Sequence, residues 1–121
     1  MNWQAALIVA VVLALFLILK RSGQISIKEA QAHLKRGALL LDVRTATEFT
    51  AGHLPRAVNL PLAEIETAVT RRVKDKEQVL LLHCQSGMRS GAARSKLKAM
   101  GYEHAFNLGS FVRASQIVKG K

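Results

Sequence analysis

Cysteine, aromatic residues and acidic residues are all scarce in this sequence. The 121-residue chain has one cysteine and 5% aromatic residues, and its 8 Asp and Glu are outnumbered by 18 Lys and Arg. A single cysteine excludes an internal disulfide and a zinc site built from several cysteines. A basic chain attracts anions, but runs of Lys and Arg stop at two residues and few aromatic side chains are present to stack bases. We therefore expect no nucleic-acid partner and favour an anionic membrane as the electrostatic partner.

The longest apolar run stands at the N-terminus. Residues 3–19 are apolar apart from Gln4, and Lys20-Arg21 follow directly. As a helix rising about 1.5 Å per residue, this run spans roughly 26 Å, slightly less than a hydrocarbon core of roughly 30 Å. A cleaved signal peptide and a buried core helix are the alternatives, but no basic residue precedes the run and no pair of small residues ends it. The sequence therefore predicts a transmembrane anchor over residues 1–21 and a folded domain over residues 22–121.

The charges that flank the apolar run predict its orientation. Lys20 and Arg21 lie on its C-terminal side, and positive residues stay on the cytoplasmic side of a membrane. We expect a single-pass protein of the inner (cytoplasmic) membrane, with its N-terminus outside and its domain in the cytoplasm. A lone reactive thiol also fits a reducing compartment. The short linker Ser22-Gly23 would keep the domain close to the membrane.

Strand-like and helix-like segments alternate in the predicted domain. Helices are expected over residues 26–36, 45–52, 62–72 and 91–100, and strands over residues 38–42, 57–60, 78–83 and 104–108. Ser26 and Thr45 each stand three residues before a glutamate, as in a capping box. A short helical turn and a loose tail are expected after Gly109. This alternation predicts an α/β fold with a parallel β-sheet and helices on both faces.

The only cysteine lies where a buried strand gives way to a helix. Residues 83–90 read His-Cys-Gln-Ser-Gly-Met-Arg-Ser, after the apolar residues 79–82. Backbone N–H groups and a helix N-terminus meet at such a loop and favour an anion there. A thiolate is an anion, so the pKa of Cys84 should fall and its sulfur should be nucleophilic.

The spacing within the loop and three further motifs resemble those of one enzyme family. Cysteine phosphatases have five residues between their cysteine and arginine, whereas Cys84 and Arg89 are separated by four. The loop resembles that of the rhodanese sulfurtransferases. The other matching motifs are Leu41-Asp42-Val43-Arg44 with Glu48-Phe49, Gly52-His53-Leu54-Pro55-Arg56-Ala57-Val58-Asn59-Leu60-Pro61, and Asn107-Leu108-Gly109. Together the matches cover most of residues 24–111 in the usual order of the family.

The resemblance implies a rhodanese-like fold and a sulfur relay. Cys84 would attack the outer sulfur of a donor such as thiosulfate, become a persulfide, and pass the sulfur to a thiol or to cyanide. A thioredoxin-like protein is one candidate acceptor. The residues that would hold the substrate and the persulfide are Gln85, Ser86, Gly87, Met88, Arg89 and Ser90. No cofactor is implied, and no metal is expected, because no two histidines share a metal-ligand spacing with Cys84.

The resemblance also implies roles for the charged residues around this loop. Arg44 would bind the sulfonate end of the donor. Asp42 and Glu48 would be structural supports, with Glu48 capping its helix, pairing with an arginine, or both. Arg89 has two open roles, either binding the donor or bracing the loop through a bidentate pair with a carboxylate. His83 precedes Cys84 on a strand, so its side chain should point the opposite way.

The sequence also departs from the family, and two other functions stay open. The family often has a Gly-Gly pair and a tryptophan after the closing strand, where this chain has Gly109-Ser110-Phe111. That difference bears on the last element rather than on the chemistry. A non-catalytic rhodanese-like binding module at the membrane is the first alternative. A cysteine phosphatase or arsenate reductase is the second, although the four-residue spacing argues against it.

Overall fold

The protein contains a four-stranded parallel sheet between two layers of helices, as the alternating pattern predicted. The structure is a computed structural model that describes residues 2–21 and 23–120. The strands are β1 (Leu39–Asp42), β2 (Val58–Asn59), β3 (Leu80–His83) and β4 (Ala105–Gly109), in the order β2-β1-β3-β4. The helices are α1 (Trp3–Arg21), α2 (Ile27–Lys35), α3 (Ala46–Ala51), α4 (Ile65–Arg72), α5 (Met88–Ala99) and α6 (Phe111–Lys119), with a 3-10 turn, η1 (Leu62–Glu64), before α4.

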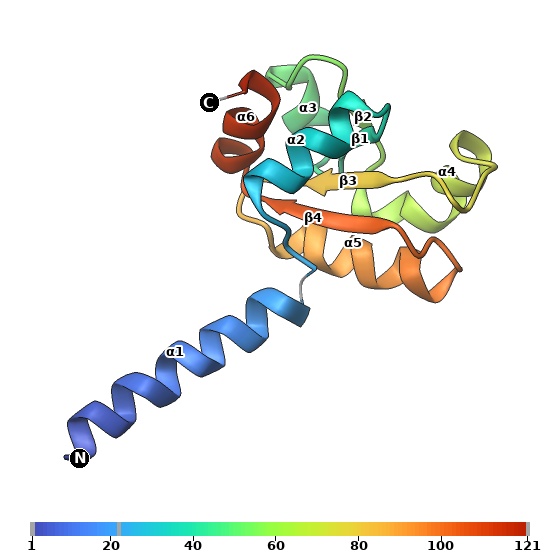
Figure 1. The fold of residues 1–121 in the computed structure, drawn as a ribbon. Helices are drawn as coiled ribbons and strands as arrows, with labels where there is room; N and C mark the ends of the chain where they lie inside the picture. Colours follow the sequence, from blue (N-terminus) through green and yellow to red (C-terminus); the bar gives the residue numbers. More distant parts are fainter. Residues whose placement is uncertain (1, 22, 121) are drawn as a thin grey trace.

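Each face of the sheet carries its own hydrophobic core, because neighbouring residues of a strand point to opposite faces. Leu41, Leu80 and Leu82 pack with side chains of α4 and α5. Leu40 and Leu81 pack with side chains of α2 and α6. Figure 1 shows the same division, with α2 and α6 on one side of the strands and α5 on the other. The central strand β3 is therefore buried on both faces.

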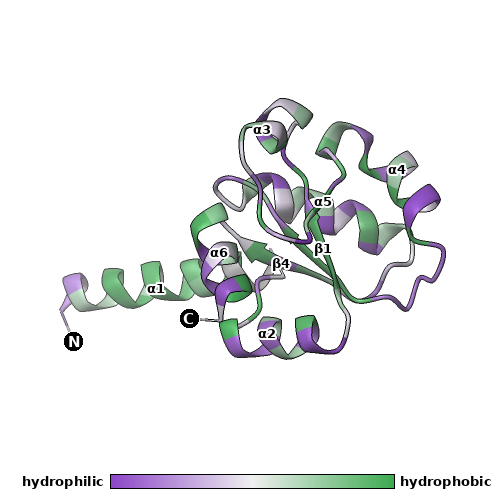
Figure 2. Ribbon diagram, turned by 90° about the horizontal axis from the view of Figure 1, so that it is seen from above, coloured by the Kyte–Doolittle hydropathy of each residue, from purple (hydrophilic) through white to green (hydrophobic). Residues whose placement is uncertain are grey.

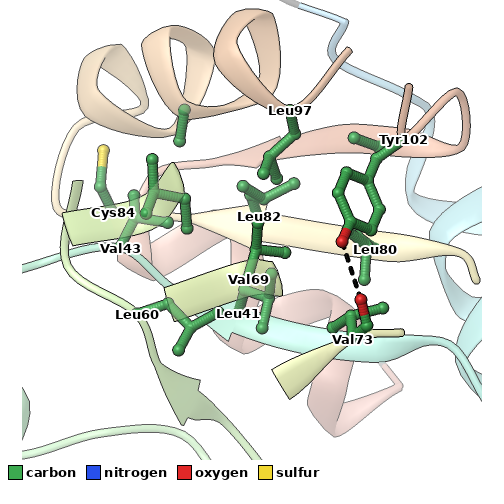
Figure 3. Packing of buried hydrophobic residues seen from close by; sticks show 13 residues of the cluster. Leu41, Val43, Leu60, Val69, Val73, Leu80, Leu82, Cys84, Leu97 and Tyr102 are labelled. Atoms are coloured by element: carbon green, nitrogen blue, oxygen red, sulfur yellow. Dashed lines mark hydrogen bonds between the residues drawn. The ribbon is translucent and has the colours of Figure 1, made fainter. Parts of the chain in front are cut away.

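The core between α5 and the sheet extends from the end of β3 to the start of β4. Figure 3 shows Cys84 at one end of this row of side chains and Tyr102 at the other. The buried Tyr102 hydroxyl donates a hydrogen bond to the Val73 carbonyl at 2.7 Å. The polar group of this large side chain is therefore satisfied inside an apolar layer.

The predicted helix starts are confirmed at two places. The Ser26 hydroxyl accepts a hydrogen bond from the Glu29 amide at the start of α2. At the start of α3, Thr45 and Glu48 form a complete reciprocal capping box. Both interactions satisfy amides that have no partner within the helix.

The C-terminal segment differs from the predicted turn and loose tail. Residues Phe111–Lys119 form the regular helix α6, which starts at a Ser110 cap. Ala114 and Ile117 stand three residues apart and are buried against α2 and the sheet. Packing of this stripe stabilises the helix, since short helices gain most of their stability from tertiary contacts.

The N-terminal helix α1 extends away from the domain, and large apolar side chains from Trp3 to Ile18 are exposed around it. Figure 1 shows it extending away from the sheet, and Figure 2 shows hydrophobic colouring along most of its length. Residues 2–21 and 23–120 contain no helix that is both long and apolar enough to cross a membrane. The predicted transmembrane anchor is therefore not supported. Ser22 of the predicted linker lies outside the described residues.

Candidate active site

The Cys84 sulfur lies at the C-terminal end of β3, inside the loop that leads into α5. The residue is fully buried, with 0% of its surface exposed. The Gly87 amide donates to Sγ at 2.9 Å, and the Ser90 hydroxyl lies 3.5 Å from the same atom. Ligands of parallel α/β sheets bind outside this end of the strands. The sulfur therefore lies where ligands of such sheets bind, next to a helix N-terminus that favours an anion.

The surroundings of the sulfur favour the thiolate. Burial raises the pKa of the Cys84 thiol, because it penalises the charged form. The hydroxyl and the amide of Ser90 lower that pKa, as do the amides of Gly87 and Ser86. The hydrogen bonds outweigh the burial, so the pKa of Cys84 lies below its ordinary value.

Three side chains of the loop do not face the sulfur, which is contacted by backbone amides and by the Ser90 hydroxyl. Gln85, Ser86 and Met88 are exposed, and the Met88 side chain is 81% exposed. Gly87 adopts a left-handed conformation with φ of +99°, which turns its amide toward Sγ. The loop thus forms a nest of N–H donors, with the side chains of Gln85, Ser86 and Met88 exposed and that of Ser90 buried.

A second backbone segment, at the end of β4, holds the loop in place. The Cys84 amide donates to the Gly109 carbonyl at 3.3 Å, and the Phe111 amide donates to the Gln85 carbonyl at 3.2 Å. A Cβ placed on Gly87 would lie 3.2 Å from the Gly109 Cα. The two backbones are therefore in close contact, and a side chain at Gly87 would push against the backbone of Gly109.

Arg89 and Glu48 form a bidentate ion pair between α5 and α3. Arg89 Nη1 donates to Glu48 Oε1 at 2.6 Å and Nη2 donates to Oε2 at 3.0 Å. The hydrogen bonds from Arg89 are the main reason why the pKa of Glu48 falls to about 2, and those from Thr45 add to the effect. Of the two roles left open by the sequence, Arg89 has the geometry for bracing the loop, and Glu48 both caps its helix and pairs with an arginine.

The Arg44 side chain, which the sequence predicted to bind the donor, is paired within the protein. Its side chain is 6% exposed, and its Nη2 atom lies 2.7 Å from both Asp42 Oδ2 and the Gly52 carbonyl oxygen. Its guanidinium also stacks over the Phe111 ring, 4.7 Å from the centroid. All these partners belong to the protein itself, so Arg44 ties β1, α6 and the chain after α3 together. Asp42, which also accepts the Arg44 amide, has the supporting position that was predicted for it.

His83 is buried and points to the opposite face from Cys84, as the strand geometry predicted. Its ring meets Phe111 edge-on at 5.7 Å, and its Nδ1 atom lies 3.2 Å from the Cys84 carbonyl oxygen. Its Nε2 atom has no hydrogen-bond partner and lies 3.7 Å from Asp42 Oδ2. Burial is the largest influence and holds the pKa of His83 below its ordinary value, so the ring is neutral near pH 7.

Asn107 is a site residue that sequence reasoning missed, since it was noted only as part of the closing motif. Its side chain is buried on β4 and contacts the loop, the start of α5 and the end of its own strand. One signal could have found it: Asn107 is an amide side chain between apolar residues of a buried strand, and such a group needs several partners.

The comparisons with known proteins agree with this geometry. The family model "Rhodanese-like domain" matches residues 26–114. The chain belongs to the rhodanese-like family. It is 35% identical over 69 residues to thiosulfate sulfurtransferase PspE of Escherichia coli, covering 57% of this chain and 66% of that protein. It is 31% identical over 96 residues to human thiosulfate:glutathione sulfurtransferase, covering 69% of this chain and 84% of that protein.

Solved structures of rhodanese-like proteins share the same fold. The human single-domain sulfurtransferase TSTD1 aligns with a TM-score of 0.66 and 29% identity, covering 76% of this chain and 94% of its own. An E. coli rhodanese solved with anions aligns with a TM-score of 0.61 and 31% identity, covering 64% of this chain and 91% of its own. The parallel sheet with helices on both faces is therefore the rhodanese fold, and the family is one of sulfurtransferases.

Proposed function

We propose that this protein is a thiosulfate-type sulfurtransferase that works through a persulfide on Cys84. The Cys84 thiolate attacks the outer sulfur of thiosulfate, the S–S bond of the donor breaks, and sulfite leaves with the bonding electron pair. An acceptor thiolate then attacks the outer persulfide sulfur and regenerates the Cys84 thiolate. With cyanide as acceptor, the product of the second step is thiocyanate.

One observation carries the proposal: several donors converge on the Cys84 sulfur. The Gly87 amide and the Ser90 hydroxyl lie within hydrogen-bond reach of Sγ, and the pKa of Cys84 lies below its ordinary value. The same donors suit a persulfide, whose outer sulfur is also an anion. Relatives that carry the name thiosulfate sulfurtransferase support thiosulfate as the donor class.

The two carboxylates described at this site argue against the phosphatase alternative. A phosphatase of this type needs a carboxylic acid that protonates the leaving group. Asp42 is bound by Arg44 and Glu48 by Arg89, and a pKa of about 2 keeps Glu48 ionised. Neither residue is available to donate a proton, so the geometry favours sulfur transfer.

The mass of the intact protein tests the proposal. After incubation with thiosulfate, we expect the mass to rise by one sulfur atom, and cyanide should remove that sulfur. Cys84→Ser, the matched control, should show no gain. An unchanged wild-type mass, with the fold intact by circular dichroism, would instead point to the binding module, or to the phosphatase if an aryl phosphate is hydrolysed.

We further propose that the physiological acceptor is the thiol of another protein, for which a thioredoxin-like protein is a candidate. Within residues 23–120, the exposed large apolar side chains are Met88 and Val112, at the first turns of α5 and α6. Neither helix contains an acidic residue, so an acidic partner with an apolar patch would fit. Val112→Gln should slow sulfur transfer to reduced thioredoxin and leave transfer to glutathione unchanged; an equal effect on both would contradict this.

We also propose that the protein works at the cytoplasmic face of a membrane and is held there by α1. Large apolar side chains from Trp3 to Ile18 are exposed around this helix, and lysine and arginine dominate the charge of the domain. In vesicle flotation with anionic lipid, the wild type should float and Leu13→Lys should not. Val112→Lys adds the same charge to an exposed site of the domain and should float like the wild type. Loss of flotation in both variants, or in neither, would count against α1 as the attachment.

A further inference from the structure

The Ser90 hydroxyl has one proton and three acceptors within reach. Its Oγ atom lies 2.7 Å from Asn107 Oδ1, 3.1 Å from the Gly87 carbonyl oxygen and 3.5 Å from Cys84 Sγ. Ser90 is fully buried, so water does not compete for this proton. A hydroxyl can donate to only one strong acceptor at a time, and the shortest distance is the one to Asn107.

The Asn107 amide also organises the second donor to the sulfur. Its Nδ2 atom donates to the Gly87 carbonyl at 3.2 Å, and the Gly109 amide donates to its Oδ1 atom at 2.8 Å. These two bonds fix which end of the amide carries the oxygen. Gly87 in turn donates its own amide to the Cys84 sulfur at 2.9 Å. One buried side chain therefore contacts Gly87 and Ser90, two of the residues whose donors face the sulfur.

The preferred acceptor of the Ser90 hydroxyl differs between the thiol and the thiolate of Cys84. A neutral thiol is a weak acceptor, so the Ser90 proton is best placed on Asn107 Oδ1. A thiolate is a strong acceptor, so rotation of the hydroxyl toward Sγ then becomes favourable. Asn107 Oδ1 keeps the hydrogen bond from the Gly109 amide after this rotation, so no buried acceptor is left without a partner.

We propose that Asn107 is a positioning residue for the reactive sulfur. Its amide holds the Gly87 loop residue and the Ser90 hydroxyl in place, and its Oδ1 atom accepts the Ser90 proton until Cys84 ionises. When the thiol proton leaves to solvent, the Ser90 hydroxyl turns to the sulfur. This role deepens the proposed function, because the same rotation serves the thiolate that attacks the donor and the thiolate that is regenerated.

Two other titratable groups lie close to Cys84 and stay unchanged in the variants below. Arg89 on α5 interacts with it electrostatically while bound to Glu48, and His83 on β3 contacts the Cys84 carbonyl. Asp42 faces Arg89 and His83 from β1 and is neutralised by Arg44. A shift in the ionisation of Cys84 in the variants therefore reports on Asn107 and Ser90.

Ultraviolet absorbance of the thiolate against pH tests the proposal directly. Cys84 is the only cysteine, so subtraction of a Cys84→Ser titration leaves its signal alone. Ser90→Ala should raise the midpoint by about one pH unit, the size of one hydrogen bond to a charged group. Asn107→Leu should also raise the midpoint, because loss of the positioned Gly87 amide and Ser90 hydroxyl outweighs the release of the Ser90 proton from Oδ1. Ser90→Thr, which keeps the hydroxyl, should have a midpoint close to that of the wild type.

The double variant separates positioning from independent effects. If Asn107 acts through Ser90, the midpoint shift of the double variant Ser90→Ala/Asn107→Leu is smaller than the sum of the two single shifts. Additive shifts, or a folded Asn107→Leu with the wild-type midpoint, would overturn the proposal. If Asn107→Leu fails to fold by circular dichroism, Asn107→Ala takes its place with the same expected shift. The titration needs no sulfur donor, so a failure of persulfide formation leaves its result readable.

Discussion

Gly87→Ala tests whether the active loop depends on contact between two backbones. A residue with a side chain at a φ of +99° costs about 1–2 kcal/mol. The added Cβ would also lie 3.2 Å from the Gly109 Cα and 3.3 Å from its carbonyl carbon, and neither backbone atom can turn aside as a side chain would. Overpacking of this kind costs about 1–3 kcal/mol. The free energy of unfolding should therefore fall by about 2–5 kcal/mol.

Gly37→Ala is the matched control for the backbone conformation alone. Gly37 has a φ of +94°, and a Cβ added to it would meet no atom within 4 Å. Its substitution should cost about 1–2 kcal/mol, the conformational part only. Urea unfolding followed by circular dichroism measures both variants, and the difference between them isolates the contact with Gly109.

Persulfide formation provides the second readout for the same pair of variants. A shift of Gly87 moves the amide that donates to the Cys84 sulfur at 2.9 Å, so Gly87→Ala should gain sulfur from thiosulfate at least about tenfold more slowly. Gly37→Ala should react like the wild type. The reasoning is refuted if both variants lose the same stability and both form the persulfide at the wild-type rate.

Two further predictions concern the response of stability to pH. The pKa of Glu48 is lowered from 4.5 to about 2, so its ion pair contributes fully above pH 4.5 and loses its contribution as pH falls toward 2. The stability difference between the wild type and Glu48→Gln, from urea unfolding, should shrink across that window; a constant difference would contradict the pairing. The pKa of His83 lies below its ordinary 6.5, so the unfolded chain takes up this proton first and stability falls as pH drops below about 6.5. His83→Gln should remove up to about 1.4 kcal/mol per pH unit of that slope, and an unchanged slope would place the titration elsewhere.

The sequence predicted the elements and the reactive residue because those features have local signals. Capping residues mark where α2 and α3 begin, and apolar runs mark the strands. Cys84 stands out because a strand end, a glycine and a helix start meet around it. Such signals depend on neighbours in the chain and need no knowledge of tertiary contacts.

The partners of the charged residues could not be predicted in the same way. Arg44 and Arg89 both follow strand ends, and nothing local shows that Arg44 turns inward to Asp42 while Arg89 reaches Glu48 on α3. Asn107 was missed for the same reason, since its contacts join β4 to a loop that lies far away in the sequence. The helix α6 was underestimated because burial of Ala114 and Ile117 depends on α2 being in place.

The close approach of Gly87 to Gly109 also limits how the chemistry of this domain can be changed. One more residue in the loop would give the spacing of a cysteine phosphatase and room for a larger oxyanion. That residue would have to bulge against the end of β4, where Gly109 and Phe111 already hold the loop from the other side. A designer who wants phosphatase activity would therefore have to rebuild two distant segments together, and a library that varies loop length alone should yield mostly inactive proteins.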